Sequence, residues 1–215
     1  YKNDIRLSNR GLRGSGEIDF LTSHTVSEDF VFFKDSTMGV SEFTNKGQLK
    51  AEGLEVPDVL GNKVLVTYVP KQDILKTKAL KNPLYLFNKE AVMLGETFLT
   101  PEGMTGKGLM YFGKAELSSA NYNYKRWVID ADTANFNLAD SGDEKTDDKI
   151  SFSSENVNSH IDFEARVGEF KSNDGTSKVE FPINEYYCYM DMFKWMMDKD
   201  EMELSEDEAD VNIDS

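Results

Sequence analysis

The chain has 215 residues, of which 39 are acidic and 24 are basic, so its formal net charge at pH 7 is −15. A field of this sign repels nucleic acids and anionic membrane surfaces, and we expect neither as a partner. Hydrophobic residues make up 39% of the chain and aromatic residues 12%, which is enough for a packed core and excludes wholesale disorder. The single cysteine, Cys188, excludes an intramolecular disulfide, and no apolar run approaches the ~20 residues that a membrane helix needs.

Short alternating or apolar segments, separated by turn residues, predict strands in the first half of the chain. Polar and apolar residues alternate over residues 17–20, and residues 30–33 form an apolar run rich in aromatic side chains. Residues 63–69 form a longer apolar strand pattern that stops at Pro70, and residues 83–87 form another. Alternation with a period of two is typical of strands that bury one face.

The second half of the chain continues in the same way, with alternation over residues 121–124 and 160–167. Residues 168–181 predict a hairpin, because Asn173-Asp174-Gly175 supplies residues that tolerate positive φ in a tight turn. The most apolar stretch, residues 186–197, fits a strand and also fits a helical spacing. We favour the strand, because Tyr, Phe and Trp pack well on a pleated surface.

A glycine-containing sequence motif of ten residues, called the glycine phrase below, occurs twice in the chain. Residues 11–20 match residues 103–112, at an offset of 92 (103 − 11), and Ser27 and Phe30 fall on Ser119 and Tyr122. We interpret each glycine of the phrase as a position of positive φ or close backbone approach at a corner of a repeating β framework. The residues that define the repeat are Gly11, Gly14, Gly16, Phe20, Phe32, Gly103, Gly106, Gly108, Phe112 and Tyr124.

The pattern predicts an all-β fold, because no long helical periodicity separates the strands. Repetition favours a β-solenoid, in which each unit buries a face against the next; two tandem β-sandwich modules are the alternative. We expect one module over residues 1–98 and a second over residues 99–204. Residues 205–215 would then be an acidic tail or the truncated start of another repeat.

Residues with catalytic or metal-binding chemistry do not form a recognisable motif. The glycine phrase has the reverse order of a dinucleotide fingerprint and precedes a strand. His24 and His160 lack ligand neighbours at metal-binding spacing, and Cys188 lies in an apolar run that suits an inert core residue. We therefore predict no catalytic residue, cofactor or metal in this chain, and favour a protein that is not an enzyme. A weak surface calcium site at residues 130–132 or 140–143 is a minor alternative.

Two alternatives to a purely structural role involve particular side chains. Trp127 and Trp195 are candidates for stacking on a sugar ring, which would indicate a carbohydrate-binding or polysaccharide-degrading β-helix, although such tryptophans are more often core residues. The Met-rich residues 190–197 are the one hint of an apolar groove that handles lipid or lipopolysaccharide in a cell envelope. Core packing explains these methionines equally well.

Several longer segments resemble very large, uncharacterised repeat proteins of Bacteroidetes bacteria. The segments are residues 99–108, 160–166, 179–186 and 191–199, and the first contains the glycine phrase. The resemblance implies a β-rich protein that is secreted or associated with the cell envelope, and this chain would be a fragment of it. It implies neighbouring repeats of the same chain, an envelope protein or a glycan as partners, and a scaffolding role. Its motifs are structural and transfer no catalytic residue.

Overall fold

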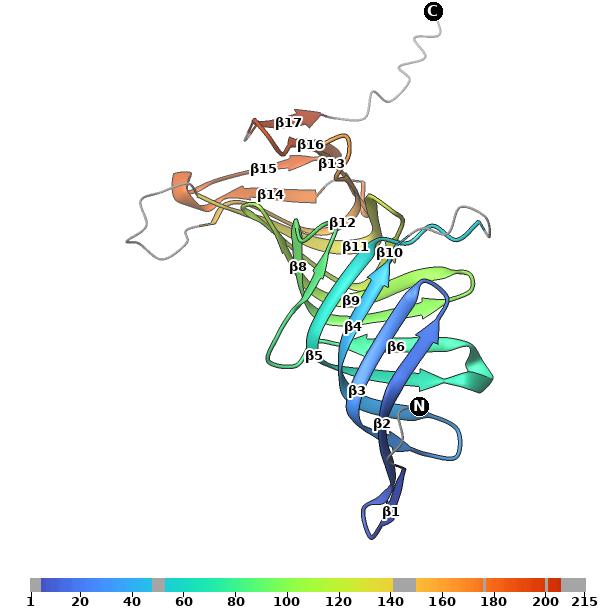
Figure 1. Cartoon of the computed structure of the whole chain (residues 1–215). Helices are drawn as coiled ribbons and strands as arrows, with labels where there is room; N and C mark the ends of the chain where they lie inside the picture. Colours follow the sequence, from blue (N-terminus) through green and yellow to red (C-terminus); the bar gives the residue numbers. More distant parts are fainter. Residues whose placement is uncertain (1–4, 48–52, 141–149, 176, 200, 206–215) are drawn as a thin grey trace, which may run out of the picture.

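The computed structural model describes residues 5–47, 53–140, 150–175, 177–199 and 201–205. The chain is all-β, as the sequence predicts: within these ranges, 17 strands form one antiparallel sheet (Figure 1). In the first part of the sheet the strands are β1 (Arg6–Ser8), β2 (Gly11–Phe20), β3 (Ser23–Phe32), β4 (Thr37–Lys46), β5 (Asp58–Val69), β6 (Ile74–Lys78), β7 (Leu84–Leu86), β8 (Ala91–Thr100) and β9 (Gly103–Phe112). The others are β10 (Ala115–Tyr124), β11 (Val128–Ala139), β12 (Ile150–Asp162), β13 (Val167–Ser172), β14 (Ser177–Phe181), β15 (Tyr186–Met190), β16 (Met192–Met196) and β17 (Glu201–Ser205). Short 3-10 turns η2 (Pro70–Gln72) and η3 (Pro182–Asn184) connect β5 to β6 and β14 to β15.

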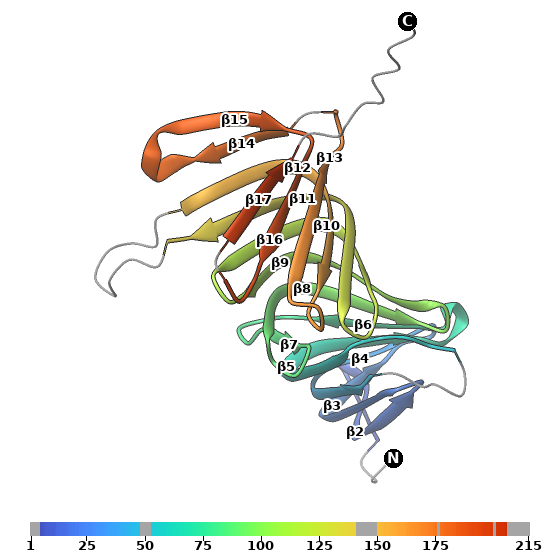
Figure 2. The same cartoon turned by 90° about the horizontal axis from the view of Figure 1, so that it is seen from above.

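Most of the sheet is a meander of hairpins. Strands β1 to β5 pair in chain order, and so do β8 to β12. Between these groups, β6 and β7 lie end to end and both pair with β5 and β8. Figure 2 shows the resulting succession, from β2 at one end of the sheet to β14 and β15 at the other.

The predicted hairpin over residues 168–181 is wrong. Strand β13 pairs with β12 and β16, whereas β14 pairs with β12 and β15. Gly175 does adopt positive φ (86°), but the connection leads to a new position along the same partner instead of back along β13. The reason is length: β12 has 13 residues and β13 only six, so β12 leaves room for a second short strand.

The strand preferred over residues 186–197 is present as β15 and β16, which are separated at Asp191 and end at Met196. The expected module boundary between residues 98 and 99 falls inside β8, so the sheet is continuous across it. The polar segment 141–149 and the acidic residues 206–215 lie outside the described residues. Within the described part of the chain, no helix is long and apolar enough to span a membrane.

The sheet folds back on itself, so that opposite ends of its strands meet. Phe87 follows β7, at the sheet end where Ala91 pairs with Phe112, and Phe163 follows β12 at the other end. Their rings nevertheless stack with centroids 4.3 Å apart. Phe20 and Tyr68 likewise come from opposite strand ends, and their ring centroids are 5.2 Å apart. The concave face therefore closes over its own side chains.

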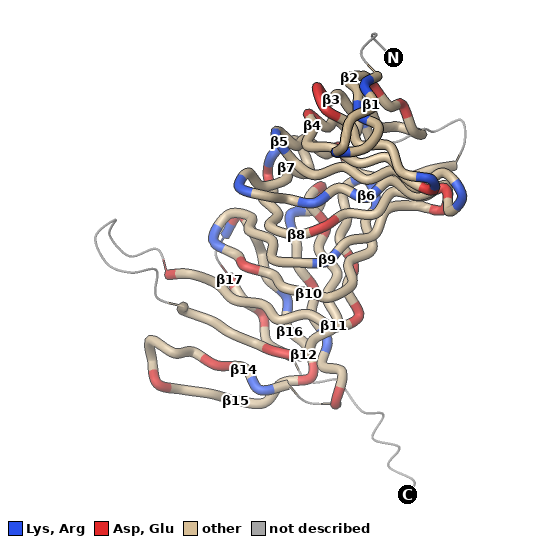
Figure 3. Tube along the Cα trace, turned by 90° about the horizontal axis from the view of Figure 1, so that it is seen from below, with Lys and Arg blue, Asp and Glu red and all other residues tan. Residues whose placement is uncertain are grey.

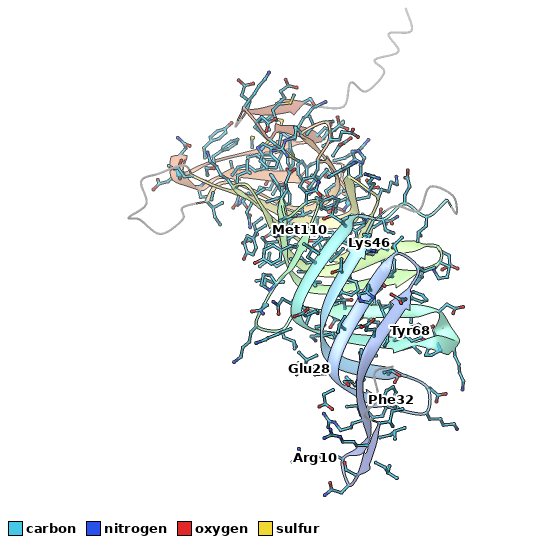
Figure 4. The ribbon with its side chains drawn as sticks, in the orientation of Figure 1. Arg10, Glu28, Phe32, Lys46, Tyr68 and Met110 are labelled. Carbon is cyan, nitrogen blue, oxygen red and sulfur yellow. The ribbon has the colours of Figure 1, made fainter. Side chains whose placement is uncertain are left out.

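The core lies inside this fold as one cluster of buried side chains from β4 to β16. Met110, at the centre of the sheet in Figure 4, is fully buried, whereas Phe32 lies near the N-terminal end and is only half-buried. Beside Phe30 and Phe43, several buried side chains of β3 and β4 are polar, and these take less space than aromatic rings. These are Ser23, Thr25, Ser27, Ser41 and Asn45.

Candidate functional site

The most distinctive local feature is a β-bulge that occurs twice, 92 residues apart. In each copy the second strand of a hairpin has one more residue than the first between two successive pairs, which bends the strand. The pairs are Gly16–Ser27 and Gly14–Phe30 in β2–β3, and Gly108–Ser119 and Gly106–Tyr122 in β9–β10. The strand bounds follow the same offset, since β2 and β3 begin and end 92 residues before β9 and β10.

A serine hydroxyl occupies the same place in both bulges. Ser27 Oγ donates to Val40 O (2.8 Å) and accepts a hydrogen bond from Asp29 N (3.2 Å). Ser119 Oγ donates to Thr133 O (2.7 Å) and accepts one from Asn121 N (3.1 Å). One hydroxyl can make both bonds, so the serine compensates backbone groups that the bulge removes from the ladder.

The glycines of the second phrase lie within β9, not at a corner between strands. A Cβ atom on Gly106 would lie 2.8 Å from Tyr124 Cε2 and 2.9 Å from Glu96 O. Gly108 has positive φ (136°), and its Cβ would lie 2.5 Å from Leu94 O. Gly14 and Gly16 are buried in β2, while Gly11 and Gly103 begin their strands at positive φ. Close approach of a ring or of the backbone accounts for Gly106 and Gly108, whereas a Cβ atom on Gly11 or Gly103 would meet no atom within 4 Å.

The aromatic residues of the repeat differ between the two copies. Phe112 is buried, with ring centroids 5.4 Å from Phe163 and 5.8 Å from Trp195. Tyr124 is also buried; its hydroxyl lies 3.3 Å from Met93 Sδ, and burial raises its pKa well above the usual value. Phe20 and Phe32 are only half-buried. Phe112 and Tyr124 of the second copy thus belong to the buried core. Phe20 and Phe32 of the first copy lie nearer the N-terminal end of the sheet and are less buried.

The two tryptophans have different surroundings. Trp127 is half-buried, and it lines a surface pocket of about 630 Å³ together with Glu55, Lys125, Arg126, Val128, Asp162 and Glu164. The Arg126 guanidinium lies 5.7 Å from its ring centroid. Trp195 is 3% exposed, so its ring face packs in the core instead of facing a ligand. Its Nε1 atom has no hydrogen-bond partner among the described residues.

The histidines lie on the surface in cross-strand pairs with aspartates. His24 Nδ1 is 2.7 Å from Asp19 Oδ1, and His160 Nδ1 is 2.6 Å from Asp130 Oδ1. Asp130 also lies 3.5 Å from Lys125 Nζ. Over the described ranges, no group of three or more His, Cys, Asp or Glu side chains could hold a metal ion, and residues 141–143 of the calcium alternative lie outside them. Cys188 is half-buried on β15.

A polar link that the sequence did not predict lies where the strand ends meet. Arg166 binds the carboxylate of Glu90, and its Nη2 lies 3.1 Å from Asp198 Oδ1. Hydrogen bonding to Asp198 and Glu90 raises the arginine pKa. These three residues border a pocket of about 340 Å³ whose apolar wall includes Phe112 and Phe163. Their separations in sequence, 32 and 76 residues, carry no local signal.

Comparison of the chain with protein-family models, curated proteins and solved structures found no match.

Proposed function

We propose that the chain is a structural and interaction module of a large bacterial envelope or secreted protein. In this proposal, related groups of strands follow one another along one framework, as the coils of a solenoid do, and neighbouring repeats of the same chain are the first partners. The repeated bulge is the single observation that carries it. A bulge with the same pairs, the same serine hydroxyl and the same offset supports a repeated building unit.

The distribution of polar groups supports a mechanical role. Ion pairs join neighbouring strands: Glu96 on β8 lies 2.9 Å from Lys78 Nζ on β6 and 3.3 Å from Lys107 Nζ on β9. Lys194 on β16 lies 2.9 Å from Glu169 on β13. Charged residues of both signs follow the strands along the sheet (Figure 3), which keeps its surface hydrated and its strands in register.

Fractionation of the cells that produce the protein tests this proposal. An antibody against the chain should detect the protein in the envelope fraction or in the culture medium. Detection in the cytoplasmic fraction alone, with marker proteins correctly separated, would contradict an envelope or secreted framework.

Trp127 supports carbohydrate binding as a second candidate function. Its half-exposed ring shares a pocket with the carboxylates of Glu55, Asp162 and Glu164, and aromatic faces beside carboxylates suit sugars. Asp162 Oδ1 already accepts hydrogen bonds from Glu164 N and Ala165 N, both at 2.8 Å, which orients this rim. A glycan array should then show binding that Trp127→Ala abolishes and Trp195→Phe, a core substitution, leaves in place. An array without any binding would contradict carbohydrate binding. Lipid or lipopolysaccharide handling stays a prediction from the sequence.

A further inference from the structure

We propose that β15 is an interaction edge that pairs with β15 of a second copy of this chain. Among the residues that the structure describes, β14 is the one strand that pairs with β15. No other described strand covers its second edge, and an edge of this kind is a template for another strand. In Figure 2 the β14–β15 ribbon lies at the far end of the sheet from β2.

Strand β15 lacks the usual protection of an exposed edge. Proteins guard edge strands with charged residues, prolines or bulges. The five residues of β15 are Tyr-Tyr-Cys-Tyr-Met, without charge or proline, and Figure 3 shows this strand without a charged residue. The short edge strands β1 and β17 contain Arg6 and two glutamates, respectively. In a chain of net charge −15, the absence of charge within β15 lowers the electrostatic cost at which a like-charged copy can approach this strand.

The side chains of β15 are as unusual as its backbone edge. Tyr186, Tyr187 and Tyr189 are 57–59% exposed, although aromatic side chains are mostly buried elsewhere in the sheet. Tyr187 and Tyr189 contact each other edge to face with ring centroids 6.1 Å apart. Lys178 Nζ on β14 lies 4.8 Å from the Tyr187 centroid. These rings form a pre-arranged surface at little further entropic cost, because their positions are already constrained.

The sequence of β15 is complementary to itself in one antiparallel register. If Cys188 of one copy lies opposite Cys188 of the other, Tyr187 lies opposite Tyr189 of the second copy and Tyr186 opposite its Met190. Cross-strand aromatic pairs and sulfur–aromatic contacts both stabilise neighbouring strands. This self-complementarity favours a second copy over an unrelated protein.

We expect the dimer to be weak. Five residues of strand bury far less area than a stable complex does. Glu185 and Asp191 flank the strand, and the same register places each near the other in the second copy. Because these carboxylates repel one another, added salt should strengthen the dimer by screening them.

Sedimentation equilibrium of the full chain tests the proposal. We expect a concentration-dependent dimer that tightens with salt and is lost in the double variant Tyr187→Lys/Tyr189→Lys, which sets lysines opposite lysines. The double variant Tyr187→Phe/Tyr189→Phe should still dimerise. Tyr85→Lys is the matched control, because Tyr85 is an exposed tyrosine on β7, which is paired on both sides. Far-UV circular dichroism verifies that each variant is folded.

Cys188 reports the register independently. Copper phenanthroline should oxidise the two thiols to a disulfide, with two electrons passing to the oxidant and two protons to solvent, because directly opposed Cβ atoms can approach to ~4.5 Å, which a disulfide spans. The lysine double variant should slow this cross-link, and Cys188→Ser should abolish it. A chain that stays monomeric and does not cross-link would overturn the proposal, as would a dimer that survives both lysines. The dimerisation and cross-linking results are independent of the cell fractionation that tests the proposed structural role.

Discussion

Gly106 lies in the middle of β9, where the absence of a side chain leaves room for the Tyr124 ring and for the backbone of β8. The serines of the two bulges act at the same scale, because each hydroxyl replaces ladder hydrogen bonds that an extra residue removes. At these positions the absence of one side chain, or the presence of one hydroxyl, therefore fits the strand to its neighbours.

Replacing Gly106 by valine should destabilise the chain by about 1–3 kcal/mol or more, because the Glu96 carbonyl that its Cβ would meet belongs to the backbone. Thermal unfolding should show a markedly lower Tm for Gly106→Val. Thr105→Val is the matched control, since Thr105 is the exposed neighbour on the same strand. Equal melting curves for wild type and Gly106→Val would contradict the close approach.

Removing the Ser27 hydroxyl should cost about 1–3 kcal/mol, because Ser27 is buried and its loss leaves Asp29 N and Val40 O without that partner. Ser119→Ala should cost less, because Ser119 is only half-buried and water can replace its hydroxyl. Urea unfolding measures both, with Ser118→Ala as the control beside the second bulge. A Ser27→Ala variant as stable as wild type would show that the hydroxyl does not compensate the bulge.

Strands are held in register by pairs that cross the ladder as well as by the backbone. Glu96 is the clearest case, because it contacts lysines on the strands at both sides of β8. Hydrogen bonding to Lys78, and to a smaller extent to Lys107, lowers the pKa of this carboxyl below its usual value. A lowered folded-state pKa means that the ionised carboxylate stabilises the fold above the unfolded pKa, and that this contribution is lost as the pH falls through the folded pKa.

Glu96→Gln should therefore lower the free energy of unfolding at pH 7 by less than about 1 kcal/mol, since the carboxylate is partly exposed. The difference from wild type should shrink as the pH falls below 4.5. Urea titrations at several pH values measure it, and Glu102→Gln, in the exposed β8–β9 turn, controls for loss of a charge. A difference that stayed constant down to the lowest pH would argue against the lysine contacts.

At the scale of the whole molecule, alternation and aromatic runs correctly predicted an all-β chain and the strand nature of β15 and β16. The partners of β13 and β14 could not be predicted, because a local turn signal at Gly175 does not specify the strand beside which the chain continues. The contacts of Phe87 with Phe163 and of Arg166 with Glu90 were equally inaccessible, since both depend on a sheet that folds over itself. The glycine phrase could be recognised from the sequence. The contact that requires a glycine at residue 106, within a strand, could not, because it is made with the Tyr124 ring of the neighbouring strand.

The fold of the sheet onto itself, which brings opposite strand ends together around one core, is tested most directly by a nuclear Overhauser effect between the rings of Phe87 and Phe163. The folded sheet predicts a clear cross-peak, because the two ring centroids are 4.3 Å apart. A flat sheet with strands of ten residues, such as β8, would keep its two ends roughly 30 Å apart, far beyond the range of the effect. Absence of this cross-peak, with both rings assigned, would contradict the closed core.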